Sequence, residues 1–182
     1  PYAKRTKDHH ILFFHQNITE VIKYNPKHIS IYMLSVEPKT KLFDLANVGK
    51  FSTVDDKEFE ELYCNTTENM ESIGYHQYEV SNYSKHNYEC KYNLNTWRNG
   101  EYLGCGLSAE SHIDNKRYEN TYNLKDYLNG GWKSIKKIAY INNLSRFETK
   151  ILLGLRLQEG VNLNPEINSL PEKNRKEFLA NL

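Results

Sequence analysis

The feature of this sequence that most constrains its fold is residues 28–36, where β-branched, aliphatic and aromatic side chains follow one another almost without a break. Such a run predicts a buried strand, and Glu37-Pro38 ends it, because the residue before a proline is restricted and proline has no backbone N–H to donate. Apolar residues at helical spacing over residues 11–22 predict a helix before this strand.

A second helix and strand follow in the same order. Asp55-Asp56 predicts a helix cap, apolar residues from Phe59 to Ile73 share one helical face, and Gly74 is suited to the position after the last turn. Residues 75–80 predict another strand. The order helix, strand, helix, strand predicts an α/β fold in which helices cover a parallel sheet.

The second half of the chain is less regular. We expect an ordered, aromatic-rich loop over residues 81–99, a strand at 101–106 that enters a glycine-containing turn, a short strand at 116–120 and a short helix at 124–128.

The character of the sequence changes again near residue 144. A capping box at 145–148 predicts a helix through Leu157, and Pro171 suits the first turn of another helix. We therefore expect a boundary near residue 140, with one domain over residues 1–140 and a mostly helical one over 141–182.

Charge and composition narrow the functional classes. The 24 basic and 23 acidic residues give a net charge of +1 without a clustered basic face, so we expect no nucleic-acid partner. No apolar run reaches about 18 residues and no signal peptide is visible, so we expect no transmembrane segment. Three widely spaced cysteines suggest reduced thiols in a cytoplasmic protein.

Two local patterns have chemical interpretations that the residues alone leave open. His86 and Cys90 have i, i+4 spacing, but two candidate ligands fall short of the three or four that a metal site needs. Gly104 and Gly106 could let the backbone approach a ligand closely, or could simply allow a tight turn.

Five blocks of the sequence resemble the HemW/HemN-like radical-SAM family (oxygen-independent coproporphyrinogen III oxidase-like proteins), in that family's order and at about its spacing. The second block resembles "GYxxYEISNF" and the last resembles "LGLRLxEGV". The blocks are residues 28–41, 74–83, 89–98, 101–112 and 153–161.

This resemblance implies part of a TIM-type barrel of βα units followed by a small, mostly helical, winged-helix-like domain. In the family, a CxxxCxxC motif in the N-terminal half binds a [4Fe–4S] cluster that works with S-adenosylmethionine (SAM). HemN members decarboxylate coproporphyrinogen III, whereas HemW members bind haem and are considered haem chaperones. The cysteines at 64, 90 and 105 lack the CxxxCxxC spacing. We therefore expect a fragment that cannot perform radical chemistry alone and that pairs with the missing N-terminal half of the barrel.

The resemblance also implies site residues. Ser35, Gly104, Gly106 and Glu110 match positions that would give supporting contacts to SAM. Tyr92 and Trp97 lie in the block that matches the HemW signature HNxxYW and would contact haem. Here Tyr92 replaces the family's histidine and Thr96 its tyrosine; tyrosine can also ligate haem iron.

Three functional hypotheses follow. The chain could be part of a HemW-like protein of porphyrin or haem metabolism, in which it completes a SAM and tetrapyrrole pocket. It could instead be a stand-alone haem- or tetrapyrrole-binding module, or an inactive truncated product. Whether the whole protein is an oxidase or a chaperone stays open.

Overall fold

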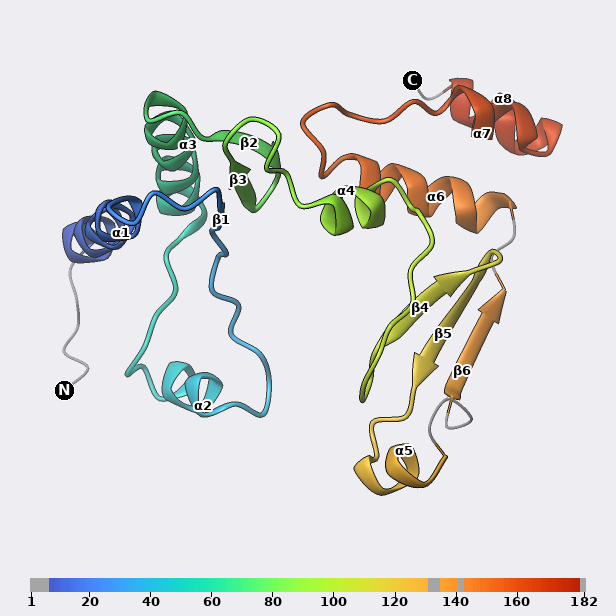
Figure 1. Cartoon of the computed structure of the whole chain (residues 1–182), viewed down its shortest axis with the longest axis horizontal. Helices are drawn as coiled ribbons and strands as arrows, with labels where there is room; N and C mark the ends of the chain where they lie inside the picture. Colours follow the sequence, from blue (N-terminus) through green and yellow to red (C-terminus); the bar gives the residue numbers. More distant parts are fainter. Residues whose placement is uncertain (1–6, 131–134, 141–142, 181–182) are drawn as a thin grey trace. The chain divides into compact units, whose positions relative to one another are not determined.

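The computed structural model describes residues 7–130, 135–140 and 143–180, which form two compact units. Unit 1 comprises Pro1–Glu89 and unit 2 comprises Cys90–Leu182, and each has its own internal packing (Figure 1). This division lies at Glu89 rather than near residue 140; the expected domain boundary at 140 stays a prediction. No helix in the described ranges is long and apolar enough to span a membrane.

Unit 1 contains three helices and three short strands among its described residues. In chain order they are α1 (Lys7–Ile22), β1 (His28–Ser30), α2 (Lys41–Asn47), α3 (Asp56–Ser72), β2 (His76–Glu79) and β3 (Asn82–Ser84). The helices expected over residues 11–22 and after Asp55 are confirmed, and so is the strand at 75–80.

The sheet of unit 1 corrects the expected strand arrangement. Its order is β1-β3-β2, and β3 is antiparallel to both neighbours, so β1 and β2 run in the same direction without being adjacent. The expectation of a parallel sheet was wrong for these strands, because Val80 and Ser81 turn the chain back and β3 forms an antiparallel hairpin with β2. A two-residue hairpin connection is shorter than any crossover between adjacent parallel strands. Residues 81–99 are therefore not a loop throughout.

The strand predicted over residues 28–36 is shorter in the structure. Strand β1 ends at Ser30, and residues 31–36 belong to no strand and have no strand partners among the described residues. High β-propensity reports a fit to a paired, half-buried surface, so it cannot by itself supply the pairing.

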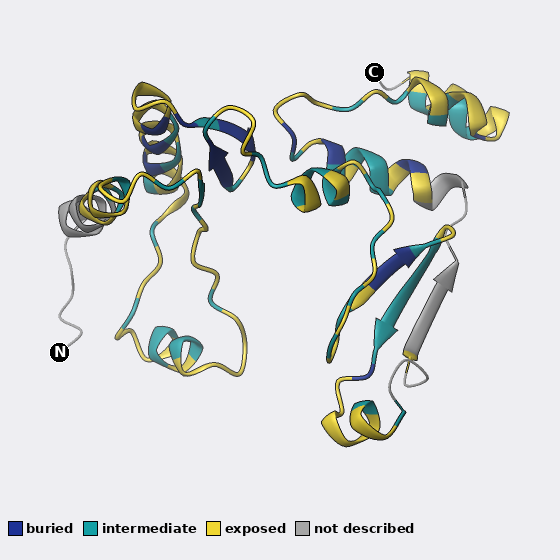
Figure 2. Cartoon of the chain, in the orientation of Figure 1, coloured by how far each residue is buried: buried dark blue, intermediate teal, exposed yellow. Residues whose placement is uncertain are grey.

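Helix α3 has the predicted termini and provides much of the unit 1 core. Glu58 N–H donates to the Asp55 carboxylate at 2.8 Å, which completes a capping box, and Gly74 has a φ of +85° just after the helix. Met70 of α3 is fully buried against Tyr75 and Tyr83. Figure 2 shows buried residues concentrated along α3 and in β2 and β3.

Unit 2 begins with a short helix, continues into a three-stranded antiparallel meander and ends in helices. Its elements are α4 (Lys91–Trp97), β4 (Glu110–Ile113), β5 (Lys116–Asn120), α5 (Leu124–Gly130), β6 (Ile135–Tyr140), α6 (Asn143–Gly154), α7 (Asn164–Ser169) and α8 (Glu172–Ala180). The strands pair in the order β4-β5-β6.

The expected strand at 116–120 and helix at 124–128 are confirmed by β5 and α5, whereas the sequence did not indicate α4, β4, β6 or α7. The strand expected at 101–106 reduces to one antiparallel bridge between Tyr102 and His112. The helices expected after residue 144 are present as α6 and α8, but α6 begins at Asn143, before the predicted capping box, and ends at Gly154 rather than at Leu157. The Ser145 side chain of the predicted capping box lies outside the described part of the chain.

The helices of unit 2 pack through a few buried residues. Phe147 of α6 is buried, and its ring meets that of Phe178 of α8 edge-on at 4.9 Å between centroids. Lys150 of α6 and Glu166 of α7 form an ion pair at 2.6 Å, with only 24% and 14% of their side chains exposed. A pair this sheltered from water ties α7 to α6 more firmly than a surface pair would.

Candidate functional site

A cluster of aromatic and cationic side chains joins α4 to β4 and β5 in unit 2. The Tyr92 ring meets the Tyr102 ring edge-on at 6.1 Å, and Tyr102 meets His112 in the same manner at 6.4 Å. Arg117 of β5 donates to Tyr102 Oη at 2.9 Å and to Asn99 Oδ1 at 3.2 Å. Because guanidinium has five N–H donors, these two bonds leave donors for a further acceptor. Tyr92 itself is 59% exposed.

The glycine turn at residues 104–106 is held by side chains of its own unit. Gly104 N–H donates to Ser111 Oγ at 2.9 Å, and Gly106 N–H donates to Tyr127 Oη at 3.1 Å. Asn120 Nδ2 donates to the Gly106 carbonyl at 2.9 Å. Both glycine amides therefore already have acceptors.

The structure shows a different reason for glycine at each of these two positions. A Cβ at Gly104 would lie 2.0 Å from the Glu110 carbonyl oxygen, so the close approach at this position is between two backbone segments. Gly106 has a φ of +110°, which side-chain-bearing residues rarely adopt. Beneath the turn lies a cavity of about 280 Å³, lined in part by Leu103, Cys105 and Tyr118.

Glu110 stands at the start of β4 with an exposed side chain, directly across from Glu119 of β5.

Trp97 lies on α4 but on a different face from Tyr92. Five residues separate them, which puts them about 140° apart around the helix axis. The Arg156 guanidinium lies 4.2 Å above the Trp97 ring and so covers one face of the indole. The indole N–H is buried and has no hydrogen-bond acceptor among the described residues.

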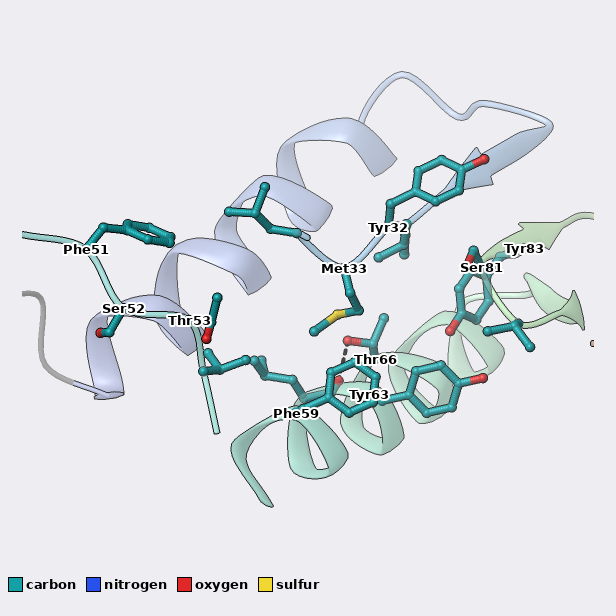
Figure 3. A pocket seen from close by; sticks show the side chains of 15 residues that line it. Tyr32, Met33, Phe51, Ser52, Thr53, Phe59, Tyr63, Thr66, Ser81 and Tyr83 are labelled. Atoms are coloured by element: carbon teal, nitrogen blue, oxygen red, sulfur yellow. Dashed lines mark hydrogen bonds between the residues drawn. The ribbon is translucent and has the colours of Figure 1, made fainter. Parts of the chain in front are cut away.

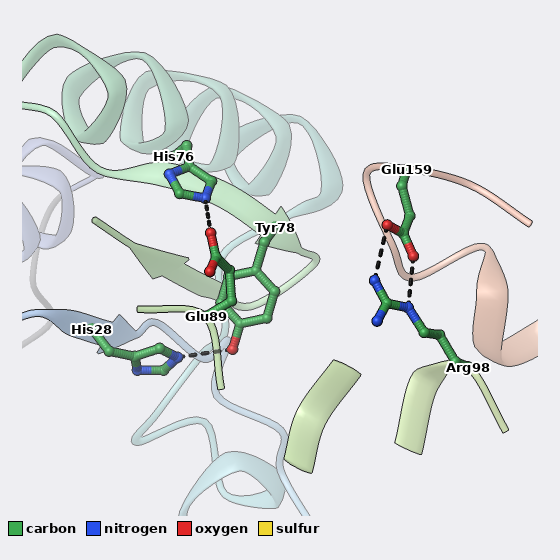
Figure 4. A network of polar contacts seen from close by, with 6 residues as sticks. All are labelled: His28, His76, Tyr78, Glu89, Arg98 and Glu159. Carbon is green, nitrogen blue, oxygen red and sulfur yellow. Dashed lines mark hydrogen bonds and ion pairs between the residues drawn. The ribbon is translucent and has the colours of Figure 1, made fainter. Parts of the chain in front are cut away.

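An ion pair between Arg98 and Glu159 lies at the C-terminal end of α4 (Figure 4). Arg98 Nε and Nη2 donate to the two Glu159 carboxylate oxygens at 2.8 and 3.0 Å. This bidentate hydrogen bond raises the pKa of Arg98 and lowers the pKa of Glu159. The pair fixes the segment after α6 beside α4, where Arg156 meets Trp97.

Unit 1 has its own polar network around β2 (Figure 4). His28 Nε2 and Tyr78 Oη are hydrogen-bonded at 2.8 Å, and burial lowers the pKa of His28. His76 Nε2 pairs with Glu89 Oε1 at 2.8 Å. The pKa of Glu89 is lowered, first by a hydrogen bond from its own backbone amide and then by His76.

The unit 1 pocket is a cavity of about 290 Å³ between α3 and two extended segments, residues 31–34 and 51–54. Its walls are largely apolar, and Figure 3 shows Met33 pointing toward α3. Ser35 follows this lining directly, is exposed and is not part of the wall. Sequence reasoning missed this pocket, because its walls come from segments about 20 to 50 residues apart.

The structure brings some of the expected site residues together. Gly104, Gly106 and Glu110 share one turn and its neighbouring strand, and Tyr92 reaches this region through Tyr102. Ser35 belongs to unit 1, and Trp97 occupies a separate face of α4. The roles assigned to all six residues stay predictions. Sequence reasoning missed Tyr102, His112 and Arg117; only the family-like block at residues 101–112 offered a signal, and it covers the first two.

The positions of the cysteines and other candidate ligands bear on a metal site. The described residues bring no three His, Cys, Asp or Glu side chains to one point where a metal ion could be held. Cys64 lies in unit 1, and Cys90 and Cys105 lie in unit 2.

Comparison with solved structures first defines the class of fold. The chain superposes on coproporphyrinogen III oxidase (HemN) from Escherichia coli, a radical SAM enzyme, with a TM-score of 0.65 and 14% sequence identity. The match covers 91% of this chain and 41% of that one. It establishes a shared α/β fold of helices and small sheets. No protein-family profile matches the chain.

Two HemW proteins are more similar to this chain in sequence than HemN is. The chain is 38% identical over 79 residues to the heme chaperone HemW of Buchnera aphidicola subsp. Schizaphis graminum, which covers 43% of this chain and 20% of that protein. It is 36% identical over 83 residues to HemW of Bacillus subtilis, covering 46% and 22%. These segments span about a fifth of each relative's length. The resemblance to the HemW/HemN-like radical-SAM family is thereby confirmed.

Proposed function

We propose that this chain forms the later part of a HemW-like radical-SAM protein and contributes to its tetrapyrrole site. The observation that carries the proposal is the 36–38% identity to two HemW heme chaperones over about 80 residues. In this proposal, unit 1 belongs to a partial TIM-type barrel that pairs with the N-terminal half, and a winged-helix-like domain follows. The whole protein acts in porphyrin or haem metabolism, as a chaperone or as an oxidase.

The tetrapyrrole contacts are assigned to the Tyr92 cluster of unit 2. Tyr92 offers an exposed hydroxyl that could serve as an iron ligand, since tyrosine ligates haem iron in some proteins. The remaining N–H donors of Arg117 suit a propionate carboxylate, which a guanidinium binds well. Trp97 is assigned to the tetrapyrrole from the signature block alone, since it lies on another face of α4 and Arg156 covers one face of its ring.

The SAM contacts are assigned to Ser35, Glu110 and the glycine turn. In this proposal the Glu110 carboxylate accepts a hydrogen bond from a positively charged ligand group, and the exposed Ser35 hydroxyl provides a second polar contact. Gly104 and Gly106 act indirectly, since their amides already bond Ser111 and Tyr127 and so fix the shape of the turn. Together with a cluster held elsewhere in the full-length protein, SAM supplies the radical chemistry of the family.

A haemin titration of the purified chain tests the tetrapyrrole assignment. We expect a saturable Soret shift, and a haemin affinity at least about tenfold lower for Tyr92→Phe than for the unchanged chain, which corresponds to about 1.4 kcal/mol of binding free energy. Tyr122→Phe is the matched control, because Tyr122 is a 68% exposed tyrosine of the same unit outside the cluster. Circular dichroism checks that each variant is folded.

Two results of the haemin titration would contradict the tetrapyrrole assignment. A folded chain without a Soret shift would remove the tetrapyrrole site from this part of the protein, and equal binding by Tyr92→Phe would remove Tyr92 as the ligand.

A further inference from the structure

A row of side chains on one face of the β4–β5 hairpin brings a histidine next to the remaining donors of Arg117. Tyr102 pairs with His112, and His112 pairs with Arg117, in antiparallel register. Residues directly opposite one another in an antiparallel pair have their side chains on the same face. The Arg117 guanidinium lies 5.9 Å from the Tyr102 ring centroid, and the His112 ring lies 6.4 Å from it. His112 and Arg117 are therefore neighbours that share one aromatic contact.

Only one nitrogen of the His112 ring is committed to the fold. His112 is 5% exposed, and its Nδ1 lies 3.0 Å from the Gly100 carbonyl oxygen. Because a carbonyl oxygen only accepts, Nδ1 carries a proton and donates it. No hydrogen bond within the described residues reaches Nε2, and this atom is not one of the partnerless side-chain atoms that are sealed from solvent, such as Trp97 Nε1. The backbone carbonyl thus fixes the ring so that Nε2 is presented to a ligand.

We propose that His112 Nε2 and Arg117 together bind one carboxylate, a propionate of the tetrapyrrole, and that His112 takes up a proton as it does so. This inference rests on the proposed function, because it names how the same site holds its ligand. Arg117 has N–H donors left after its bonds to Tyr102 and Asn99, and a guanidinium binds carboxylates well. Since Nδ1–H already bonds Gly100, Nε2 donates to the carboxylate only as an imidazolium. The buffer supplies that proton, and the negative charge of the carboxylate favours the charged ring.

The charges around His112 favour an anion beside Arg117. The next row of the same face holds Glu110 and Glu119, which are opposite one another on β4 and β5. The Glu101 carboxylate already accepts a backbone N–H of the β4–β5 turn at 2.7 Å. The segment after α4 faces His112 with a backbone carbonyl. Among these groups Arg117 alone has a fixed positive charge, so it attracts a carboxylate that Glu110 and Glu119 repel.

Calorimetric titration of the full chain with haemin, in buffers of different ionisation enthalpy, counts the protons exchanged per haemin bound. The quantity compared is the difference between the unchanged chain and His112→Asn, because ligation of iron by the Tyr92 oxygen would release a proton in both. Asparagine keeps an N–H donor near the place of Nδ1 and removes Nε2. We expect the unchanged chain to take up about one proton more per haemin than His112→Asn. His86→Asn, at an exposed histidine of unit 1, should match the unchanged chain.

A second variant and a second ligand test the carboxylate itself. Arg117→Gln is expected to lose the same proton, since no guanidinium then holds the carboxylate beside His112. This variant decides the question if circular dichroism shows that His112→Asn is unfolded. Haemin dimethyl ester has no free carboxylate, so we expect it to bind the unchanged chain at least about tenfold more weakly and without the additional proton.

Four results would overturn the carboxylate site. Equal proton counts in the unchanged chain and both variants, together with a saturable Soret shift, would overturn it and leave the proposed function standing. The same additional proton with haemin dimethyl ester would show that no carboxylate is involved. Uptake of that proton on addition of SAM alone would assign the site to the carboxylate of SAM instead. A folded chain that binds no haemin would overturn both this inference and the proposed function.

Discussion

Replacing Gly104 with alanine tests why a glycine stands in the turn before β4. The new Cβ would lie 2.0 Å from the Glu110 carbonyl oxygen and 2.7 Å from its carbonyl carbon. A carbon and an oxygen in contact normally stay about 3.3 Å apart or more, so the two backbones must separate by more than an ångström. That movement strains the Gly104–Ser111 hydrogen bond and the neighbouring Tyr102–His112 bridge.

The cost can be estimated from these contacts. Overpacking in a close contact costs about 1–3 kcal/mol, and loss of one hydrogen bond adds about 1 kcal/mol. We therefore expect Gly104→Ala to destabilise the chain by about 2–4 kcal/mol in urea unfolding followed by circular dichroism. We also expect faster exchange of the His112 amide, which donates to Tyr102 O at 2.9 Å.

Whether Gly104→Ala lowers or raises the free energy of unfolding tests the backbone-contact argument. If Gly104 faced open space, alanine would stabilise the chain by about 0.4–1 kcal/mol, because it restricts the unfolded state. Gly160→Ala is the control: Gly160 has a φ of +71°, and a Cβ added there would meet nothing within 4 Å, so the change should cost about 1–2 kcal/mol without altering His112 exchange. An unchanged or increased stability of Gly104→Ala would refute the backbone-contact argument.

Three further changes test the fold. Met70→Ala, in the fully buried core of unit 1, should cost about 2–5 kcal/mol in urea unfolding, whereas Leu152→Ala at an exposed site should stay within about 0.5 kcal/mol. Asp55→Ala removes the cap of α3 and should cost about 1 kcal/mol by the same assay. Burial lowers the pKa of His28 below its usual 6.5. His28 is therefore harder to protonate in the folded chain than in the unfolded chain, so the free energy of unfolding falls as the pH drops from 6.5 through the folded-state pKa. The stability–pH curve of His28→Gln should be flatter over this range.

The sequence predicted the helices better than the sheets. Periodic apolar residues and an acidic cap specify α3 locally, so its bounds could be predicted from residues 55–74 alone. Strand β3, Asn82–Ser84, is buried at all three positions although two of its residues are polar. Its burial depends on pairing with both β1 and β2, which no local pattern reveals. Residues 31–36 show the converse, a strand pattern for which the described residues supply no strand partner.

The candidate site was predicted in part for a similar reason. The glycine turn was visible in the sequence because glycine has distinctive backbone freedom, although its function as a contact between two backbone segments required the structure. Arg117 was missed because it meets Tyr102 and Asn99 from 15 and 18 residues away. A single arginine in a short polar strand gives no sign of such a contact.

The proposed tetrapyrrole contacts of unit 2 around Tyr92 can be located by mapping the haemin site with NMR. Amide spectra of the isotope-labelled chain would be recorded at increasing haemin concentration. We expect line broadening and shifts to concentrate at Tyr92, Tyr102 and Arg117 and to saturate at one haemin per chain. Changes confined to the unit 1 pocket, or spread evenly over exposed apolar residues, would contradict it.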